Sequence, residues 1–259
     1  MLLPRIIPFL LIKNGGLVKT TKFSNPKYVG DPLNAVKIFN EKFVDEIVIL
    51  DIEASKNNKA PDFKLIEKLA RECRMPLCYG GGVKNIDEIE KIVNLGVEKV
   101  ALSSILIEDK NLIYEAVKRF GSQSIVAVFD FKKSSFLNKY NIFVNNGRKK
   151  CNLDPVKLTK EIASMGIGEL IINSIDCDGL RSGYDMGLIN LIKSQIPNIP
   201  ITFVGGAGSL NDINSLIENF KYVGAGAGSL FVFKGKFKAV LINYPSPTEK
   251  KEFFKSFYS

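Results

Sequence analysis

Apolar stretches of strand length recur along this chain, and segments with helical periodicity separate them. Eight such stretches are present, at 5–12, 46–52, 76–80, 99–104, 124–130, 169–175, 200–205 and 222–228. Their continuous Val, Ile and Leu character, without polar alternation, is typical of parallel strands buried on both faces. The helical segments often begin with Asp or Asn and lie at 31–43, 62–72, 85–96, 111–121, 154–166, 186–195 and 210–220.

Eight strand–helix units in 259 residues match a (β/α)8 barrel, and a doubly wound sheet is the alternative. Internal repetition favours the barrel, because the segment at 76–104 resembles the segment at 200–229. We therefore predict the α/β class and a single (β/α)8 TIM barrel built from two similar half-barrels. The predicted division is one domain over 1–259, with half-barrels at roughly 1–121 and 122–245 and a tail at 246–259 that could form a last amphipathic helix.

The composition limits the chemistry available to this chain. It has no histidine, and its cysteines at 73, 78, 151 and 177 form no C-x-x-C pair. We therefore expect neither a zinc site nor another metal or cofactor, and any general acid or base must be Asp, Glu, Lys, Tyr or Cys. Free thiols are usual in a reducing compartment, so we expect a cytoplasmic protein.

The formal net charge of +9 could suit nucleic acid, an acidic protein or a phosphorylated ligand. Lysines mix with glutamates in helical segments such as 63–72 and 87–99, as on a solvated helix surface. No basic cluster is interleaved with aromatic residues, so we expect no nucleic-acid partner. No apolar run approaches the roughly 18 residues of a membrane span, so we expect no membrane partner.

Glycine and serine residues gather at the predicted carboxyl ends of the strands, where ligands bind in barrels of this kind. A glycine run at 80–82 follows the third strand, and Gly-Gly-Ala-Gly at 205–208 follows the seventh. Glycine lets backbone N–H groups approach an anion closely, and a following helix favours negative charge. We predict two phosphate cradles for a ligand phosphorylated at both ends, with the candidate residues Gly82, Ser103, Ser104, Gly179, Gly206, Gly228 and Ser229.

Four acids also fall at the predicted strand ends: Asp51, Asp130, Asp176 and Asp178. A carboxyl group in this place is a candidate for proton transfer. Such acids can instead cap loops or helices. This alternative applies most to Asp176, which could point away from the mouth, and least to Asp130, because its strand runs straight into it.

Several motifs together resemble the cyclase subunit of imidazole glycerol phosphate synthase, HisF, over nearly the whole chain. They are GDP at 30–32, DEIVILDIEAS at 45–55, YGGGV at 79–83, FGSQSIVAV at 120–128, NSIDCDG at 173–179, SGYD at 182–185 and VGGAG at 204–208. The resemblance implies a (β/α)8 barrel that receives ammonia through its core from a glutaminase subunit at its bottom face. At the top face, such a barrel splits and cyclises a bis-phosphorylated ribonucleotide.

The acid–base pair of that family is incomplete here. The resemblance implies one catalytic aspartate at the end of strand 1 and one at the end of strand 5, and the matching residues are Leu11 and Asp130. Losing one positioned acid–base group lowers a rate by about a hundred- to ten-thousand-fold, so we expect cyclase activity to be lost. The Asn-Thr phosphate pair of the family is Ser103-Ser104 here, a milder change because hydroxyl groups can still donate.

Other features of the family are retained. The resemblance implies substrate-binding roles for Lys19, Asp51 and Asp178. At the opposite face, it implies that two bases and two acids form the ring that gates an ammonia channel, namely Arg5, Glu46, Lys99 and Glu169. We expect the glutaminase to dock around this ring, with Glu98 in the interface, and an acidic contact surface on it would profit from the net positive charge.

Three further segments, at 10–23, 27–46 and 229–245, resemble a branch of HisF-like proteins from surface-polysaccharide gene clusters, named HisF2 or WbuZ. The resemblance implies that a HisH-like glutaminase and the barrel supply ammonia to a separate amidotransferase, which converts an acetamido group of a sugar into an acetamidino group. Three interpretations remain open: a non-cyclising ammonia conduit, an ordinary cyclase of histidine biosynthesis, and a silent barrel that activates or scaffolds the glutaminase.

Overall fold

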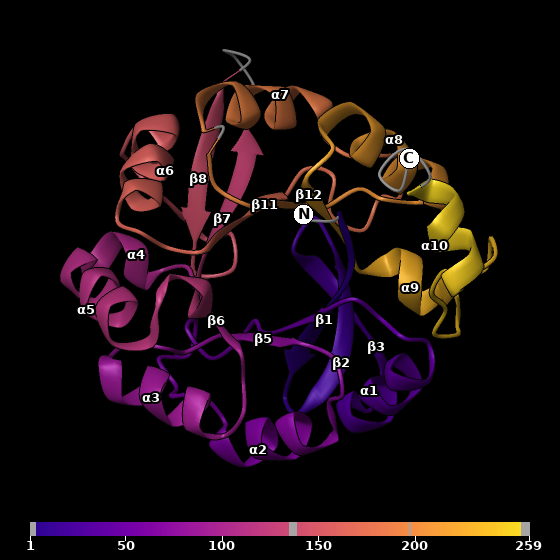
Figure 1. Ribbon diagram of the computed structural model, residues 1–259, viewed down its shortest axis with the longest axis horizontal. Coiled ribbons are helices and arrows are strands. Elements are labelled where there is room, and N and C mark those ends of the chain that lie inside the picture. The colour runs from indigo at the N-terminus through magenta and orange to yellow at the C-terminus, as the bar shows by residue number, and fades with distance from the viewer. Residues whose placement is uncertain (1–3, 135–138, 197, 255–259) are drawn as a thin grey trace.

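Eight parallel strands close into a barrel in the computed structural model, which describes residues 4–134, 139–196 and 198–254 (Figure 1). In order around the barrel they are β1 (Arg5–Lys13), β4 (Ile47–Asp51), β5 (Leu77–Gly80), β6 (Lys99–Leu102), β7 (Ile125–Lys133), β10 (Glu169–Ser174), β11 (Ile201–Val204) and β12 (Val223–Ala227). Parallel pairing of β12 with β1 completes the circle. The predicted (β/α)8 barrel is therefore confirmed, while its division into half-barrels stays a prediction.

Helices of 9 to 11 residues surround the barrel: α1 (Pro32–Glu41), α2 (Phe63–Glu72), α3 (Ile86–Asn94), α5 (Lys110–Phe120), α6 (Pro155–Ser164), α7 (Met186–Gln195) and α8 (Leu210–Phe220). Each begins after an Asp, Asn or Ser whose side chain accepts a backbone N–H of the first turn. Such a cap contributes about 0.5–2 kcal/mol, so local sequence sets where each helix starts. No helix in the described ranges has the length and apolarity needed to cross a membrane.

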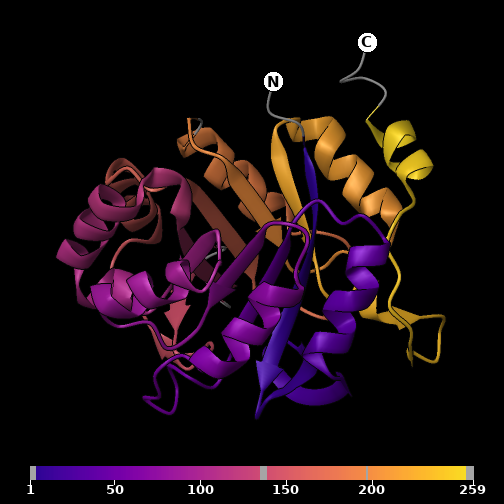
Figure 2. The same cartoon turned by 60° about the horizontal axis from the view of Figure 1, so that its bottom comes forward.

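Two antiparallel additions that we did not predict extend the barrel at its mouth. β2 (Gly16–Thr21) and β3 (Ser24–Gly30) follow β1, and β8 (Tyr140–Val144) with β9 (Lys149–Lys150) follow β7. Figure 2 shows the β1–β2–β3 meander, in indigo, reaching the side of the molecule opposite α10. Both additions therefore place residues above the carboxyl ends of the barrel strands.

The barrel interior is apolar between its two ends. Successive residues of a strand point to opposite faces, so every second residue points inward. Residues of six strands form this inner cluster, with Leu50 and Val204 packed against it: Ile7, Phe9, Val48, Cys78, Ala101, Val126, Val128 and Ile171. β12 contributes glycines instead, and a Cβ on Gly226 would lie 2.6 Å from the Phe9 ring. The absence of a side chain there gives the Phe9 ring its room inside the barrel.

The segment after β12 returns to the opposite face of the barrel. It contains α9 (Ser229–Val232), the hairpin of β13 (Phe233–Lys234) and β14 (Ala239–Val240), and α10 (Pro247–Phe253). The Tyr244 hydroxyl donates to the Ile6 carbonyl at 2.8 Å and accepts from the Asp45 N–H at 3.3 Å. Lys250 Nζ donates to Asp45 Oδ1 at 2.7 Å. A helix is thus present in the predicted tail, whose residues 255–259 lie outside the described part of the chain.

We predict that Tyr244→Phe lowers the free energy of unfolding by about 1–3 kcal/mol, because it leaves buried backbone groups of Ile6 and Asp45 without this partner. Urea denaturation followed by circular dichroism measures the change. Tyr114→Phe is the matched control, because the Tyr114 side chain is 62% exposed and we expect a change within about 0.5 kcal/mol. Equal stability of the two variants would contradict an anchoring role for Tyr244.

Candidate functional site

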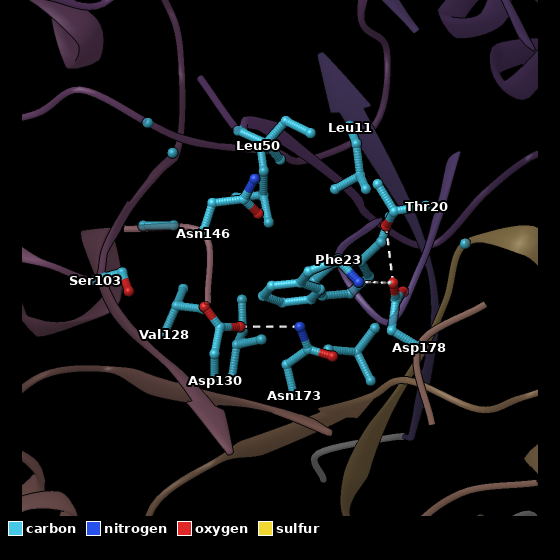
Figure 3. A pocket seen from close by; sticks show the side chains of 18 of the residues that line it. Leu11, Thr20, Phe23, Leu50, Ser103, Val128, Asp130, Asn146, Asn173 and Asp178 are labelled. Atoms are coloured by element: carbon cyan, nitrogen blue, oxygen red, sulfur yellow. Dashed lines mark hydrogen bonds between the residues drawn. The ribbon is translucent and has the colours of Figure 1, made fainter. Parts of the chain in front are cut away.

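A pocket with a cavity of about 150 Å³ lies at the carboxyl ends of the barrel strands (Figure 3). The structure brings together at its wall Leu11 and every residue that we predicted to act on substrate or phosphate: Lys19, Asp51, Gly82, Ser103, Ser104, Asp130, Asp178, Gly179, Gly206, Gly228 and Ser229. Asp176 is not part of this wall, and its carboxylate accepts the Lys133 N–H at 2.7 Å. The capping alternative therefore describes Asp176, whereas the roles of the wall residues stay predictions.

Asp130 is the acid at the end of β7 that faces the pocket. Its Oδ1 accepts a hydrogen bond from Asn173 Nδ2 at 2.9 Å, and Asn173 projects from the neighbouring strand β10. Burial raises the pKa of Asp130 to about 7, the bond from Asn173 opposes this, and the nearby Asp178 carboxylate adds to it. Asp130 can therefore hold or release a proton near neutral pH, as a general acid or base must.

Leu11 lies across the pocket from Asp130 (Figure 3). Parallel pairing places it beside Leu50 of β4, and both side chains line the pocket. Of the residues that β1 contributes to this wall, Phe9 and Leu11, neither can ionise. The β1 side of the pocket is therefore apolar at the height of Asp130.

The two other acids of the wall are held by hydrogen bonds from backbone N–H groups and from one hydroxyl group. Asp51 Oδ1 accepts the N–H groups of Glu53 and Ala54 at 2.9 and 3.1 Å. Asp178 Oδ2 accepts from the Thr20 hydroxyl at 2.8 Å and from the Phe23 N–H at 3.2 Å. Burial raises the pKa of both carboxyl groups. These bonds fix the loops around the pocket, and neither acid takes the position of Leu11.

Lys19 lies on the strand β2. Its side chain is buried, and its Nζ donates to the Phe9 carbonyl. Burial lowers the pKa of Lys19 to about 8, and Asp178 acts in the opposite direction. A Cβ on Gly228 would lie 2.5 Å from Lys19 Nζ, so the glycine at the end of β12 makes room for this ammonium group beside the pocket.

The glycine runs adopt conformations that other residues avoid. Gly82 has φ +78° and Gly206 has φ +112°, in the region that favours glycine. A Cβ on Gly82 would lie 2.6 Å from the Lys59 carbonyl oxygen, and one on Gly206 would collide with that of Gly183. Close loop packing therefore also requires these glycines, so their presence does not by itself identify phosphate cradles.

The two serines after β6 differ in their contacts. Ser104 Oγ donates to Asn145 Oδ1 at 3.0 Å and accepts the Asn145 N–H at 3.3 Å. Ser103 presents its hydroxyl to the pocket (Figure 3). Ser103 is thus the serine that could meet a ligand directly, while Ser104 connects to the turn after β8.

Sequence reasoning missed Phe23, Asn145, Asn146 and Asn173, which also line the pocket. The first three lie on the two added hairpins and have positive φ angles of 60°, 53° and 56°. Asn-Asn-Gly at 145–147 is a recognisable turn signal. The sequence could thus have shown the turn, although its contact with Ser104 depends on the closed barrel.

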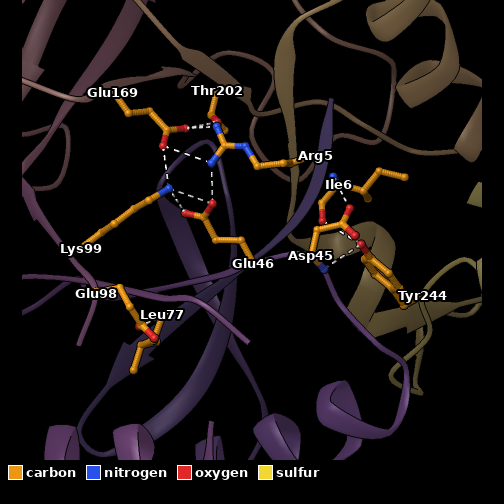
Figure 4. Close-up of polar contacts among 10 residues, drawn as sticks. All are labelled: Arg5, Ile6, Asp45, Glu46, Leu77, Glu98, Lys99, Glu169, Thr202 and Tyr244. Atoms are coloured by element: carbon orange, nitrogen blue, oxygen red, sulfur yellow. Dashed lines mark hydrogen bonds and ion pairs between the residues drawn. The ribbon is translucent and has the colours of Figure 1, made fainter. Parts of the chain in front are cut away.

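The opposite end of the barrel holds the four predicted charged residues in one cluster (Figure 4). Arg5 contacts Glu46 and donates to Glu169 Oε1 at 2.7 Å. Lys99 Nζ lies 2.8 Å from Glu46 Oε1 and 2.9 Å from Glu169 Oε2. Thr202, which we did not predict, donates to Glu169 Oε1 at 2.5 Å. The cluster is a closed ring with alternating charges, and we call it the charged ring.

The ring is stabilised by its own ion pairs. The Glu46 and Glu169 side chains are only 5% and 6% exposed, so an unpaired charge there would be costly. Although burial opposes it, the two carboxylates raise the pKa of both Arg5 and Lys99. Burial alone would raise the pKa of Glu169, but Arg5 and Lys99 lower it. All three of these groups are therefore charged at neutral pH.

Glu98 lies beside the ring but is not part of it (Figure 4). Its Oε2 accepts the Leu77 N–H at 2.8 Å, which satisfies the first backbone donor of β5. The structure thus gives Glu98 a role within the barrel, and its predicted role in a partner interface stays a prediction. Within the described ranges, no three His, Cys, Asp or Glu residues are grouped to hold a metal ion.

Comparison with known proteins identifies relatives of this chain. The family model described as histidine biosynthesis protein matches residues 5–238. A Leptospira interrogans protein with the provisional name imidazole glycerol phosphate synthase subunit HisF is 53% identical over 254 residues, covering 98% of this chain and 100% of that protein. A Vibrio vulnificus (strain YJ016) protein, provisionally named subunit hisF3 of the same synthase, is 54% identical over 252 residues, covering 97% and 96%.

A further relative extends this similarity to another named subunit. A Pseudomonas aeruginosa protein with the provisional name imidazole glycerol phosphate synthase subunit hisF2 is 47% identical over 241 residues, covering 93% of this chain and 95% of that protein. The three relatives therefore match this chain over nearly their whole lengths.

We predict that Lys99→Met lowers the free energy of unfolding by about 3–5 kcal/mol, because Arg5 is then left alone between two buried carboxylates. Urea denaturation at pH 7 measures the change. Lys64→Met on the exposed side of α2 is the matched control and is expected to change stability by less than about 0.5 kcal/mol. If Lys99→Met lowers the free energy of unfolding by less than about 1 kcal/mol, the ion pairs of Lys99 are not needed for stability.

We predict that Asn173→Leu raises the pKa of Asp130 above about 7, because it removes the bond that favours the carboxylate. Carbon-13 NMR of labelled aspartate measures the titration, and Asp51 is the internal control.

Since the folded pKa of Asp130 lies above the ordinary 3.8, its contribution to stability falls as pH rises from about 4 to 7. Asp130→Asn is expected to remove this dependence, and an Asp130 pKa near 4 in the wild type would contradict both expectations.

Proposed function

The chain belongs to the family of HisF-type imidazole glycerol phosphate synthase subunits, and we propose that it conducts ammonia to the barrel mouth without cyclising a ribonucleotide there. The observation that carries this proposal is the apolar pocket wall at Leu11, opposite Asp130 at the end of β7. Cyclisation in this family depends on an acid–base pair across the mouth. One member of that pair is a leucine in this chain.

The bonding of the other pocket acids supports the loss of cyclisation. Asp51 and Asp178 could replace the missing group only if their carboxylates were free to reach the β1 side. Each instead accepts two hydrogen bonds from its own loop surroundings. Moving either acid would leave those partly buried donors without this partner, at a cost of up to about 1–3 kcal/mol for each.

The apolar interior between the charged ring and the mouth supports the proposal that a small neutral molecule is conducted there. Inward-facing side chains between the two ends are apolar, including Ile7, Val48, Val126 and Ile171. An apolar interior disfavours ammonium, because removing an unpaired charge from water costs a large free energy. Removing neutral ammonia from water costs much less. The ion pairs of the ring are formed in this structure, so under this proposal one of its cations moves when ammonia enters.

Under this proposal, each end of the barrel meets a different enzyme. A HisH-like glutaminase docks at the charged ring, around Arg5, Lys99 and Glu98, and releases ammonia from glutamine. A separate sugar amidotransferase at the mouth uses the ammonia to convert an acetamido group into an acetamidino group during surface-polysaccharide biosynthesis. Both partners and the chain then act in the cytoplasm, where glutamine and free thiols are present.

A second function has specific support. The relatives are named as subunits of imidazole glycerol phosphate synthase, and the retained Asp130 and Lys19 line a pocket at the mouth. Under this alternative, the chain cyclises the bis-phosphorylated ribonucleotide in histidine biosynthesis with Asp130 as its single acid–base group. A scaffold that only activates the glutaminase is the third interpretation, and the retained ring and interior give it no particular support.

We predict that the purified chain, mixed with a HisH-type glutaminase, glutamine and the bis-phosphorylated ribonucleotide, permits glutamate release but forms almost no imidazole product. Leu11→Asp is expected to raise product formation at least about tenfold, since a positioned acid–base group contributes about a hundred- to ten-thousand-fold. Glutamate is measured enzymatically and the imidazole product by chromatography.

Leu11→Asn is the control for this experiment, because it has the shape and polarity of aspartate without its proton chemistry. It is expected to leave product formation at the wild-type level. Rapid product formation by the wild-type chain would contradict the proposal and favour the cyclase. Transfer of labelled amide nitrogen from glutamine to a sugar, in a mixture that requires this chain, would separate the conduit from the scaffold.

A further inference from the structure

A second cleft, of about 440 Å³, lies beside the mouth. It shares Thr20, Phe23, Ile52 and Asn146 with the central pocket, so the two spaces meet along the β2–β3 turn. Phe23 separates them, with its ring toward the central pocket (Figure 3). A volume of this size is in the range of small-molecule sites. We call it the basic cleft, because lysine and arginine side chains line it.

Five cationic side chains line the basic cleft against one carboxylate, Glu53. They are Lys13, Lys22, Lys56, Lys132 and Arg148. Lys13 and Lys56 both lie 3.4 Å from Glu53 Oε1 and compensate it. None of the ion pairs found among the described residues includes Lys22, Lys132 or Arg148. The excess positive charge therefore faces the cleft from these three residues.

The walls of the cleft are held in place by hydrogen bonds. The Lys22 N–H donates to the Asp178 carbonyl at 3.0 Å, and the Phe23 N–H donates to Asp178 Oδ2 at 3.2 Å. The Arg148 N–H donates to the Val144 carbonyl at 3.1 Å. These bonds fix the backbone from which Lys22 and Arg148 project, so the two cations start from defined positions on opposite turns.

Both turns also contain residues in an unfavourable backbone conformation. Lys22, Phe23 and Asn146 have φ angles of 50°, 60° and 56°. Left-handed conformations are costly for residues other than glycine, especially for an aromatic one, and they concentrate at binding sites. Gly147 packs against the Phe23 ring, because a Cβ there would lie 2.9 Å from Phe23 Cδ2. The two turns thus support each other and form one continuous wall.

We propose that the basic cleft binds the anionic end of a small phosphate-bearing molecule, in particular one with two linked phosphates. Lys22, Lys132 and Arg148 supply charge-assisted hydrogen bonds to phosphate oxygens. The uncharged remainder of the molecule extends past Phe23 to the mouth of the central pocket. The interpretation that this bound molecule is the acceptor of ammonia rests on the proposed function, whereas the anion site itself does not.

The test measures pyrophosphate binding to the purified chain alone by isothermal titration calorimetry, at low salt and again at about 0.15 M salt. The triple variant Lys22→Gln, Lys132→Gln, Arg148→Gln is expected to weaken one binding event by about tenfold or more, since it removes three charged donors. No glutaminase or ribonucleotide is present in this experiment. A negative binding result therefore does not contradict the proposal that the barrel conducts ammonia, and evidence against ammonia conduction does not contradict pyrophosphate binding in the cleft.

Two control variants locate the site. The triple variant Lys64→Gln, Lys68→Gln, Lys118→Gln makes the same change in net charge on the outer helices α2 and α5, and its affinity is expected to stay within about twofold of wild type. Ser229→Asp places a carboxylate in the central pocket and is expected to retain the event that the cleft variant loses. Circular dichroism confirms folding of each variant.

Three results would overturn the proposal. Equal weakening by both triple variants would mean that only net charge attracts pyrophosphate. Loss of the event in Ser229→Asp, with retention in the cleft variant, would place the anion in the central pocket. Absence of binding to the wild-type chain at low salt would show that the cleft does not hold this class of anion.

Discussion

The register of the closed barrel is the constraint on which the rest of this structure depends. Because side chains alternate along a strand, the inward residues of β1 are Arg5, Ile7, Phe9 and Leu11. Arg5 belongs to the charged ring, Ile7 and Phe9 to the apolar interior, and Leu11 to the mouth. β10 repeats this order with Glu169, Ile171 and Asn173. A shift of one residue would turn all of these side chains outward. The ring and the pocket are therefore two ends of one pattern and cannot be positioned independently.

Different surroundings give the same types of residue opposite properties at the two ends. In the charged ring, two acids and two bases compensate one another, so Lys99 keeps a raised pKa despite its burial. At the mouth, Lys19 donates to a neutral carbonyl, and burial lowers its pKa to about 8. Asp130 has an amide as its partner, and burial raises its pKa to about 7. Proton exchange near neutral pH is thus favoured at the mouth and suppressed in the ring.

The parts that could be predicted from sequence are those that local pattern controls. Continuous apolar runs located the eight strands, and capping residues such as Asp31 and Asp154 mark helix starts within a few residues of those expected. Spacing then brought the strand-end residues to one mouth. The hairpins were missed because β2, β3 and β8 are partly polar, with turns that need positive φ angles. Phe23 and Asn146 reach the pocket only through contacts between these turns, which no local pattern encodes.

Leu11 has a further electrostatic consequence for the residue that faces it. A second carboxylate at this place would repel the charged form of Asp130 and raise its pKa further, as paired acids do. With leucine there, the remaining causes of the raised pKa are burial and the more distant Asp178. The mouth then carries less negative charge, so it repels an incoming anion less. With leucine at position 11, the polar side chain that contacts the Asp130 carboxyl group is therefore that of Asn173.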